Sequence, residues 1–171
     1  TATLAGNTPT VGTGAWTVVS GTATVTNPAS PTSGITGLTI GGTSRLRWTI
    51  SNGICAASTD DVLIKVDASP TAAAAGPDQT LCNVTTATLA GNTPTIGTGQ
   101  WTIVAGTATI TDAANPATGI TGLTIGASVT LRWTISNGVC AASTDDVVIS
   151  VDESPTVSAA GPDQTLCNVT T

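Results

Sequence analysis

The sequence LRWTISNGVCAASTDDVVISV, residues 131–151, gives the clearest indication of the fold of this chain. At each of its ends, large apolar side chains stand at every second position. In 131–135 they are Leu, Trp and Ile, and in 147–151 they are Val, Ile and Val. Alternation with a period of two is typical of half-buried β-strands. Between the two runs stands Asn137-Gly138, a dipeptide that favours a two-residue type I′ turn. The stretch therefore predicts a β-hairpin.

Five further short runs between residues 71 and 155 have strand character. They are rich in Thr, Val and Ile, whose β-branched side chains favour strands, and Gly, Pro or Asn stands between them. Together with the hairpin they give about seven antiparallel strands, which predicts an all-β, immunoglobulin-like sandwich with no helix longer than one turn. The five runs are Gln79–Cys82, Thr86–Ala90, Trp101–Ile103, Thr107–Thr111 and Gly119–Ile125.

The same pattern occurs twice, 85 positions apart. The sequence TATLAGNTPT begins at Thr1 and again at Thr86, and Trp16 returns as Trp101 without an insertion or deletion. Many of the differences between the two copies exchange one apolar residue for another. Solenoid repeats have about 20–50 residues, whereas 85 residues make a small domain. The period therefore predicts tandem domains.

Stretches rich in Pro, Gly and small residues mark the joints between these domains. They are SPTAAAAGP at 69–77 and SPTVSAAGP at 154–162. We therefore expect an Ig-like repeat that lacks its first strand at 1–70, a complete Ig-like repeat at 71–155, and the first strand of the next repeat at 156–171. The chain is then expected to be an excerpt from a longer tandem array.

Composition excludes several classes of function. The net charge is -6, only 8% of residues are charged, and there is no histidine. A chain without a basic cluster cannot neutralise phosphates, so we expect no nucleic-acid partner. The longest wholly apolar stretch, 72–75, is far too short to cross a bilayer, so we expect no membrane insertion. The 40% hydrophobic content excludes a disordered chain.

The four cysteines predict a disulfide framework. None is in C-x-x-C spacing, so a zinc site is not indicated, and disulfides imply an oxidising, extracellular location. Two pairings of the cysteines can recur in every repeat. We favour Cys82 with Cys140 inside the complete repeat, where the bond would close a loop worth about 4 kcal/mol; an immunoglobulin topology could, however, place them at opposite ends of the sandwich. The alternative joins Cys55 to Cys82 and Cys140 to Cys167 across the joints.

The tryptophans could form either a core or a sugar-stacking platform. Trp101 and Trp133 each lie two positions from an Ile or Leu of the same strand, so their side chains point to the same face as these apolar neighbours, which favours core packing. A glycan-binding repeat would need at least one of them exposed, whereas a structural spacer should bury all four. The four are Trp16, Trp48, Trp101 and Trp133.

Paired acids are the densest polar feature. Asp60-Asp61 and Asp145-Asp146 lie in predicted strands, where neighbouring side chains point to opposite faces, so neither pair can act together in acid–base catalysis. We expect solvated or turn-capping carboxylates, with an interdomain calcium site using Asp67, Asp78 or their repeat partners as the alternative. No EF-hand calcium loop is present, and we expect no metal and no cofactor.

The chain resembles the PKD-like and Ig-like tandem repeats of very large Bacteroidota cell-surface proteins, including gliding-motility adhesins. The residues that carry the resemblance are AGPDQTLC, TATLAGNTPT, GTGQWTIV, GITGLTIG and LRWTISNGVCAASTDDVVISV, and it covers the whole chain. The resemblance implies export through type IX secretion, display as a long filament at the cell surface, and no catalytic residues.

We accordingly predict a non-enzymatic structural spacer, a stalk repeat that holds a distal adhesive region away from the cell. The rival prediction is a repeat that binds a surface glycan through avidity. The expected partners are neighbouring repeats of the same chain, with lateral self-association or surface glycans as further candidates.

Overall fold

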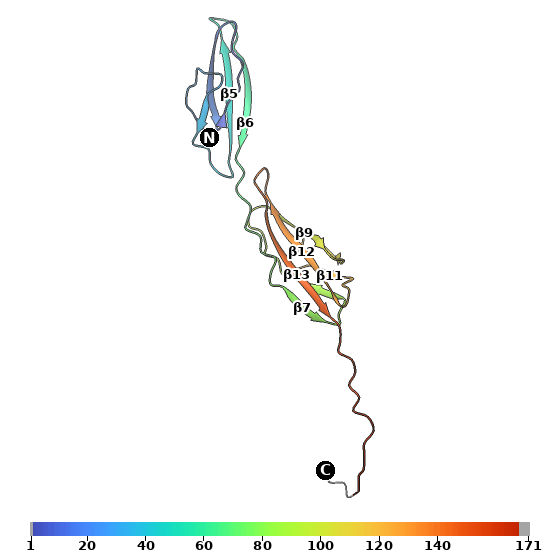
Figure 1. Ribbon diagram of the computed structural model, residues 1–171. Coiled ribbons are helices and arrows are strands. Elements are labelled where there is room, and N and C mark those ends of the chain that lie inside the picture. The colour runs from blue at the N-terminus through green and yellow to red at the C-terminus, as the bar shows by residue number, and fades with distance from the viewer. Residues whose placement is uncertain (1, 168–171) are drawn as a thin grey trace. The chain divides into compact units, whose positions relative to one another are not determined.

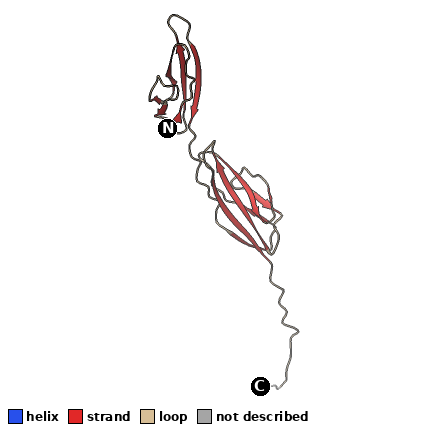
Figure 2. Cartoon of the chain, turned by 45° about the horizontal axis from the view of Figure 1, so that its top comes forward, coloured by secondary structure: helices blue, strands red, loops and turns tan. Residues whose placement is uncertain are grey.

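The computed structural model describes residues 2–167, which form β-strands joined by loops and contain no helix (Figures 1 and 2). Within these residues no helix is long and apolar enough to cross a membrane. In chain order the strands are β1 (Ala2–Thr3), β2 (Thr13–Ser20), β3 (Thr24–Val25), β4 (Gly34–Thr36), β5 (Thr43–Ser51), β6 (Ser58–Lys65), β7 (Gln79–Cys82), β8 (Thr86–Thr88), β9 (Thr98–Ala105), β10 (Thr109–Ile110), β11 (Gly119–Thr121), β12 (Ala127–Ser136) and β13 (Ser143–Asp152).

The second repeat, residues 71–155, holds seven of these strands in two sheets. β7, β13, β12 and β9 form the larger sheet in that order, and β10, β11 and β8 form the smaller one. β7 covers the predicted run Gln79–Cys82, and β12 and β13 contain the two alternating halves of 131–151. The predicted all-β, immunoglobulin-like sandwich is therefore confirmed.

The first repeat, residues 1–70, has the same two sheets with one strand fewer. β2, β5 and β6 form one sheet and β1, β4 and β3 the other. In the described part of the chain no strand pairs with the outer side of β6. β6 is therefore a sheet edge, with a row of unpaired backbone groups.

One strand pair departs from the antiparallel prediction. β7 runs parallel to β13, with Gln79 opposite Ile149 and Cys82 opposite Asp152. Parallel neighbours need a long crossover connection, which the rest of the repeat supplies because β7 is its first strand and β13 its last. Alternation along a strand reveals its buried face but not its direction, so the expectation of seven antiparallel strands was wrong for this pair.

The predicted type I′ turn at Asn137-Gly138 was also wrong. β12 ends at Ser136 and β13 begins at Ser143, so a longer loop joins them. Of the dipeptide only Gly138 has a positive φ, 54°, whereas a type I′ turn requires positive φ at both central residues. The loop is bound by a carboxylate: Asp67 Oδ2 accepts a hydrogen bond from Val139 N at 3.1 Å.

The core of each repeat is built around a pair of tryptophans. The ring centroids of Trp16 and Trp48 are 5.0 Å apart with an interplanar angle of 39°, and Trp101 and Trp133 have the same distance and angle. The most exposed of the four is Trp16, with 6% of its surface accessible, so all four rings are buried. A Cβ at Gly14 would overlap the Trp48 indole, which explains a glycine inside β2.

Contacts divide the chain into two compact units. The first contains the residues up to 73 together with 93–99 and 134–144, and the second contains 74–92, 100–133 and the residues from 145 onward. Two short segments of the second repeat, which contain loops and the strand residues next to them, are thus grouped with the first unit. The predicted domain boundaries near Pro70 and Pro155 remain a prediction.

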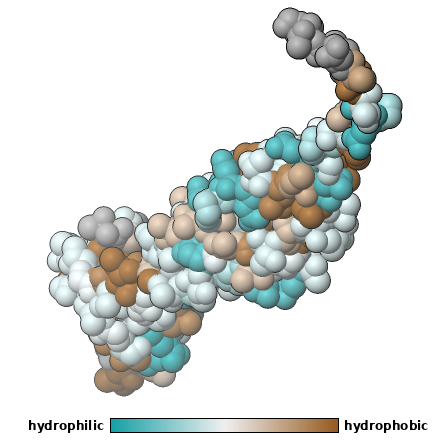
Figure 3. Space-filling model, turned by 90° about the horizontal axis from the view of Figure 1, so that it is seen from below, coloured by the Kyte–Doolittle hydropathy of each residue, from teal (hydrophilic) through white to brown (hydrophobic). Residues whose placement is uncertain are grey.

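The surface carries apolar side chains in small groups. On the face that Figure 3 shows, brown apolar residues are separated by pale and teal polar ones. Several of the exposed apolar residues lie in loops or in the C-terminal segment, among them Ile54, Val139, Val157 and Leu166. Threonine-rich strand faces supply much of the rest of the polar surface.

Candidate functional site

The most distinctive site is a groove along the open edge of β6 in the first repeat, called here the β6 groove. Its volume is about 530 Å³. Two tryptophans, each at most 6% exposed, and two aspartates are among the residues that line it. Its lining residues are Thr3, Leu4, Ala5, Gly6, Asn7, Trp16, Trp48, Asp60, Asp61, Val62 and Ile64.

In the second repeat the chain itself covers the matching edge. β7 pairs along β13, and Ala75, just before β7, is only 1% exposed. Beneath this cover Val147 and Ile149 are 1% and 0% exposed. The matching residues of the first repeat, Val62 and Ile64, are only half-buried. The β6 groove is therefore the space that residues 74–82 fill in the second repeat.

Carboxylates hold this covering segment in place. Asp145 Oδ2 accepts a hydrogen bond from Ala75 N at 2.7 Å, and Asp78 Oδ1 accepts one from Val148 N at 2.8 Å. These bonds are charge-assisted and bind the backbone of one segment to the edge of the other. The sequence predicted turn-capping or solvated acids and missed this role, although the repeated Asp145 and Asp78 positions were a signal.

The indole nitrogens of the two repeats differ as well. Trp133 Nε1 donates to Asn92 O at 3.2 Å. Asn92 is fixed in turn by the covering segment, because Ala74 N donates to Asn92 Oδ1 at 2.8 Å and Asn92 N donates to Ala74 O at 2.9 Å. Trp48, the counterpart of Trp133, is 4% exposed, and its Nε1 has no hydrogen-bond partner among the described residues. A buried donor without a partner is costly and rare.

The other members of the acid pairs form ion pairs on the sheet surface. Arg47 Nε and Nη2 bind the Asp61 carboxylate at 2.7 and 3.0 Å, and this bond lowers the pKa of Asp61 to about 2. Arg132 binds Asp146 at 2.7 and 2.8 Å and lowers its pKa in the same way. These are cross-strand pairs rather than turn caps, which corrects that part of the prediction.

The Asp67 carboxylate binds a lysine side chain and a backbone N–H of the same chain. Lys65 Nζ lies 2.7 Å from its Oδ1, and this contact, followed by the bond from Val139 N, lowers the pKa of Asp67. Asn137 Nδ2 donates to the neighbouring Ala68 O at 2.9 Å. No group of three or more Cys, Asp or Glu side chains within residues 2–167 is arranged to hold a metal ion. The alternative of an interdomain calcium site remains a prediction.

The favoured disulfide between Cys82 and Cys140 is contradicted by the sheet register. Both thiols are free, as are those of Cys55 and Cys167. Cys82 lies opposite Asp152, the last residue of β13, whereas Cys140 precedes the first. Ten strand residues at about 3.3 Å each separate the two cysteines by about 30 Å, and a disulfide tolerates a Cα separation of about 7 Å. The parallel placement of β7, which the sequence did not reveal, is the reason.

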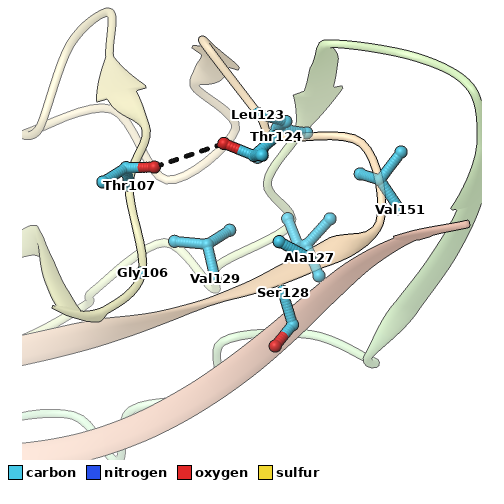
Figure 4. A pocket seen from close by; sticks show the side chains of 9 residues that line it. Gly106, Thr107, Leu123, Thr124, Ala127, Ser128, Val129 and Val151 are labelled. Atoms are coloured by element: carbon cyan, nitrogen blue, oxygen red, sulfur yellow. Dashed lines mark hydrogen bonds between the residues drawn. The ribbon is translucent and has the colours of Figure 1, made fainter.

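A second, much smaller pocket lies at one end of the second repeat (Figure 4). Its volume is about 90 Å³, well below the 300–1,000 Å³ of most ligand sites. Leu123, Val129 and Val151 line it, and a hydrogen bond of 3.5 Å between the Thr107 and Thr124 hydroxyls borders it. We interpret it as a packing void.

The strands, the sheets and the paired tryptophans define this chain as a tandem β-sandwich repeat. No protein-family model and no curated protein matches the sequence. Among solved structures, it is similar to the PKD domain of the KIAA 1837 protein, with 24% identity over 54% of this chain and 92% of that chain and a TM-score of 0.42. It is also similar to domains 4–9 of the surface layer protein SbsC, with 16% identity over 93% of this chain and 26% of that chain and a TM-score of 0.34.

Proposed function

We propose that this chain is a structural spacer, a stalk repeat of a long extracellular adhesin or fibre that holds a distal binding region away from the cell. The observation that supports it best is the burial of all four tryptophans, of which the most exposed is Trp16 at 6%. A sugar-stacking platform needs an exposed ring, so the rival glycan-binding function loses its main candidate residues.

The use of the polar groups supports the same proposal. The acids that could have served catalysis instead hold strands together: Asp61 and Asp146 in ion pairs, and Asp78 and Asp145 in bonds to backbone donors. A spacer depends on the number and durability of its domains rather than on a reactive site. We infer a non-enzymatic role on these grounds.

The cellular setting follows from the resemblance of the sequence to PKD-like and Ig-like repeats of Bacteroidota surface proteins. We propose that the parent protein leaves the cell by type IX secretion and acts at the cell surface in adhesion or gliding. Protease shaving of intact cells that carry the parent protein tests this location. Release of peptides from these repeats is expected, and their protection until the cells are lysed would contradict it.

Force spectroscopy and glycan binding together separate the two functions. Pulling on the chain should give discrete unfolding events, one for each repeat that unfolds. An array of surface glycans should give no binding above that of a heat-unfolded control. Specific glycan binding that is lost on mutation of a tryptophan would overturn the spacer in favour of the glycan-binding repeat.

A further inference from the structure

We propose that the second repeat contains a shear clamp, formed by β7 and β13 together with the carboxylates of Asp78 and Asp145, that resists tension along the chain. A stalk between a cell and an adhesive region carries such tension, so the role of the clamp rests on the proposed spacer function. The contacts that form the clamp do not depend on that function, and all of them lie within the second compact unit.

The clamp joins the first strand of the repeat to the last. β7 and β13 run in the same direction (Figure 1). At one end of the pair Gln79 lies opposite Ile149, and at the other end Cys82 lies opposite Asp152. Tension enters the repeat before β7 and leaves it after β13, because these strands stand at its two ends in the sequence. The two strands are therefore pulled in opposite directions along their own axes.

The direction of loading decides how the hydrogen bonds between two strands break. Strands joined by a hairpin are antiparallel, and a pull on their free ends separates the bonds one after another. Parallel strands that are pulled at opposite ends must slide past each other, so all the bonds between them share the load. The parallel direction of β7 therefore makes its pairing with β13 the load-bearing contact of the repeat.

Two carboxylates extend the clamp beyond the paired strand residues. Asp145 Oδ2 accepts a hydrogen bond from Ala75 N at 2.7 Å, and Asp78 Oδ1 accepts one from Val148 N at 2.8 Å. Each side of the clamp thus supplies one carboxylate to the backbone of the other. Charge-assisted hydrogen bonds are stronger than neutral ones. These bonds lie on the part of the clamp that tension reaches first, because Ala75 and Asp78 precede β7.

The other end of the clamp is closed by a backbone bond, and its inner side is shielded from water. Asn83 N donates to Asp152 O at 2.9 Å, directly after the last paired residue of β7. Ala75, Ile149 and Val151 are at most 2% exposed. Water competes for hydrogen-bonding groups, so burial of these side chains should slow the replacement of the clamp's bonds by water under load.

The decisive experiment pulls on the second repeat of the full chain in two directions. Click-chemistry handles at the exposed Ser69 and Ser154 load β7 and β13 in shear, whereas handles at Val84 and Ser154 peel β7 from β13 at one end. We expect a higher unfolding force in shear. An equal or higher force in the peeling direction would overturn the clamp. Urea unfolding of both handled chains controls for a difference in stability.

Asp145→Ala tests the part that the carboxylates play. It should raise the rate of unfolding under shear about fivefold to thirtyfold, as expected for the loss of one charge-assisted hydrogen bond. In the peeling direction the rate should hardly change, because the strands separate first at Asp152. Asp145→Asn keeps an oxygen acceptor and should restore part of the resistance. Equal rates for Asp145→Ala and the parent chain under shear would overturn the role of this carboxylate.

Leu131→Ala is the control for a general loss of stability. Leu131 is 0% exposed and lies in β12, which is not part of the clamp. The variant should unfold in less urea than Asp145→Ala, yet its unfolding rate under shear should change less, because the core is still packed when the clamp breaks. The reverse order under shear would show that mechanical resistance follows overall stability, and it would overturn the clamp.

Failure of the clamp and failure of the spacer function give different results. Equal forces in the two pulling directions would overturn the clamp and leave the spacer function in place. Specific glycan binding that depends on a tryptophan would overturn the spacer function, while a higher force in shear would still establish the clamp as a property of the domain.

Discussion

The two repeats have nearly the same sequence, yet they differ along one sheet edge. In the second repeat β7 covers β13, and Ile149 is fully buried. In the first repeat β6 has no such cover, Ile64 is half-buried, and the Trp48 indole nitrogen is unpaired in the described part of the chain. The comparison shows that one short strand and the residues before it complete the core of this domain.

The largest expected effect comes from the matched isoleucines. Ile149→Ala should lower the free energy of unfolding of the second repeat by about 2–5 kcal/mol, because it leaves a cavity in a closed core. Ile64→Ala should cost the first repeat less, about 1–2 kcal/mol, because this side chain already faces the groove. Residue-resolved hydrogen exchange can measure the stability of each repeat separately.

A control for this pair is available at two leucines. Leu46 and Leu131 are both 0% exposed, so their replacement by Ala should cost each repeat a similar amount. Equal costs for the two isoleucine variants would show that the missing strand does not loosen the first core.

The next effect concerns the carboxylate that holds the covering segment. Asp145→Ala removes the acceptor of the Ala75 N–H and should destabilise the second repeat by about 1–2 kcal/mol. Asp60 accepts a hydrogen bond only from its neighbour Asp61 N among the described contacts, so Asp60→Ala should cost less than about 0.5 kcal/mol. Urea unfolding of both variants measures the difference, and a larger loss for Asp60→Ala would reverse the interpretation.

The indole hydrogen bond gives a smaller difference. Trp133→Phe removes the indole N–H that donates to Asn92 O, whereas Trp48→Phe removes a nitrogen that has no partner in the described part of the chain. We expect the Trp133 variant to lose about 1 kcal/mol more than the Trp48 variant. Thermal unfolding followed by circular dichroism is the measurement, and a greater loss at Trp48 would mean that its nitrogen is bonded in solution.

The smallest expected effect is the loss of stability at low pH. The folded-state pKa of Asp61 is lowered to about 2 by Arg47, below the value of about 3.9 for an unfolded aspartate. The stabilisation is therefore complete above about pH 4 and is lost as the pH falls through about 2. It should be small because exposed ion pairs are weak.

Urea titrations between pH 7 and pH 2 measure this dependence, with Asp61→Asn as the control that should flatten it. Asp146 and Asp67, whose pKa values are also lowered, will keep a residual slope in that variant. Stability that rises as the pH falls from 4 to 2 would contradict the assigned ion pairs.

The repeat, the positions of most strands and the apolar residues of the core could be predicted from the amino-acid sequence alone. The 85-residue period, the alternation in 131–151 and the spacing of Trp101 and Trp133 from their apolar neighbours are local or periodic features, and burial of one strand face follows from them directly. β7 at Gln79–Cys82 and the burial of Trp133 were both predicted in this way.

The direction and pairing of β7, and with them the positions of the cysteines, could not be predicted from the sequence and are seen in the folded chain. Alternation is the same for parallel and antiparallel strands, so the sequence could not show that Cys82 lies opposite Asp152 rather than near Cys140. The role of Asp145 was hidden for the same reason, because its partner, Ala75 N, lies 70 residues away. Contacts between segments distant in the chain depend on how the sheets are assembled, and local patterning does not encode that assembly.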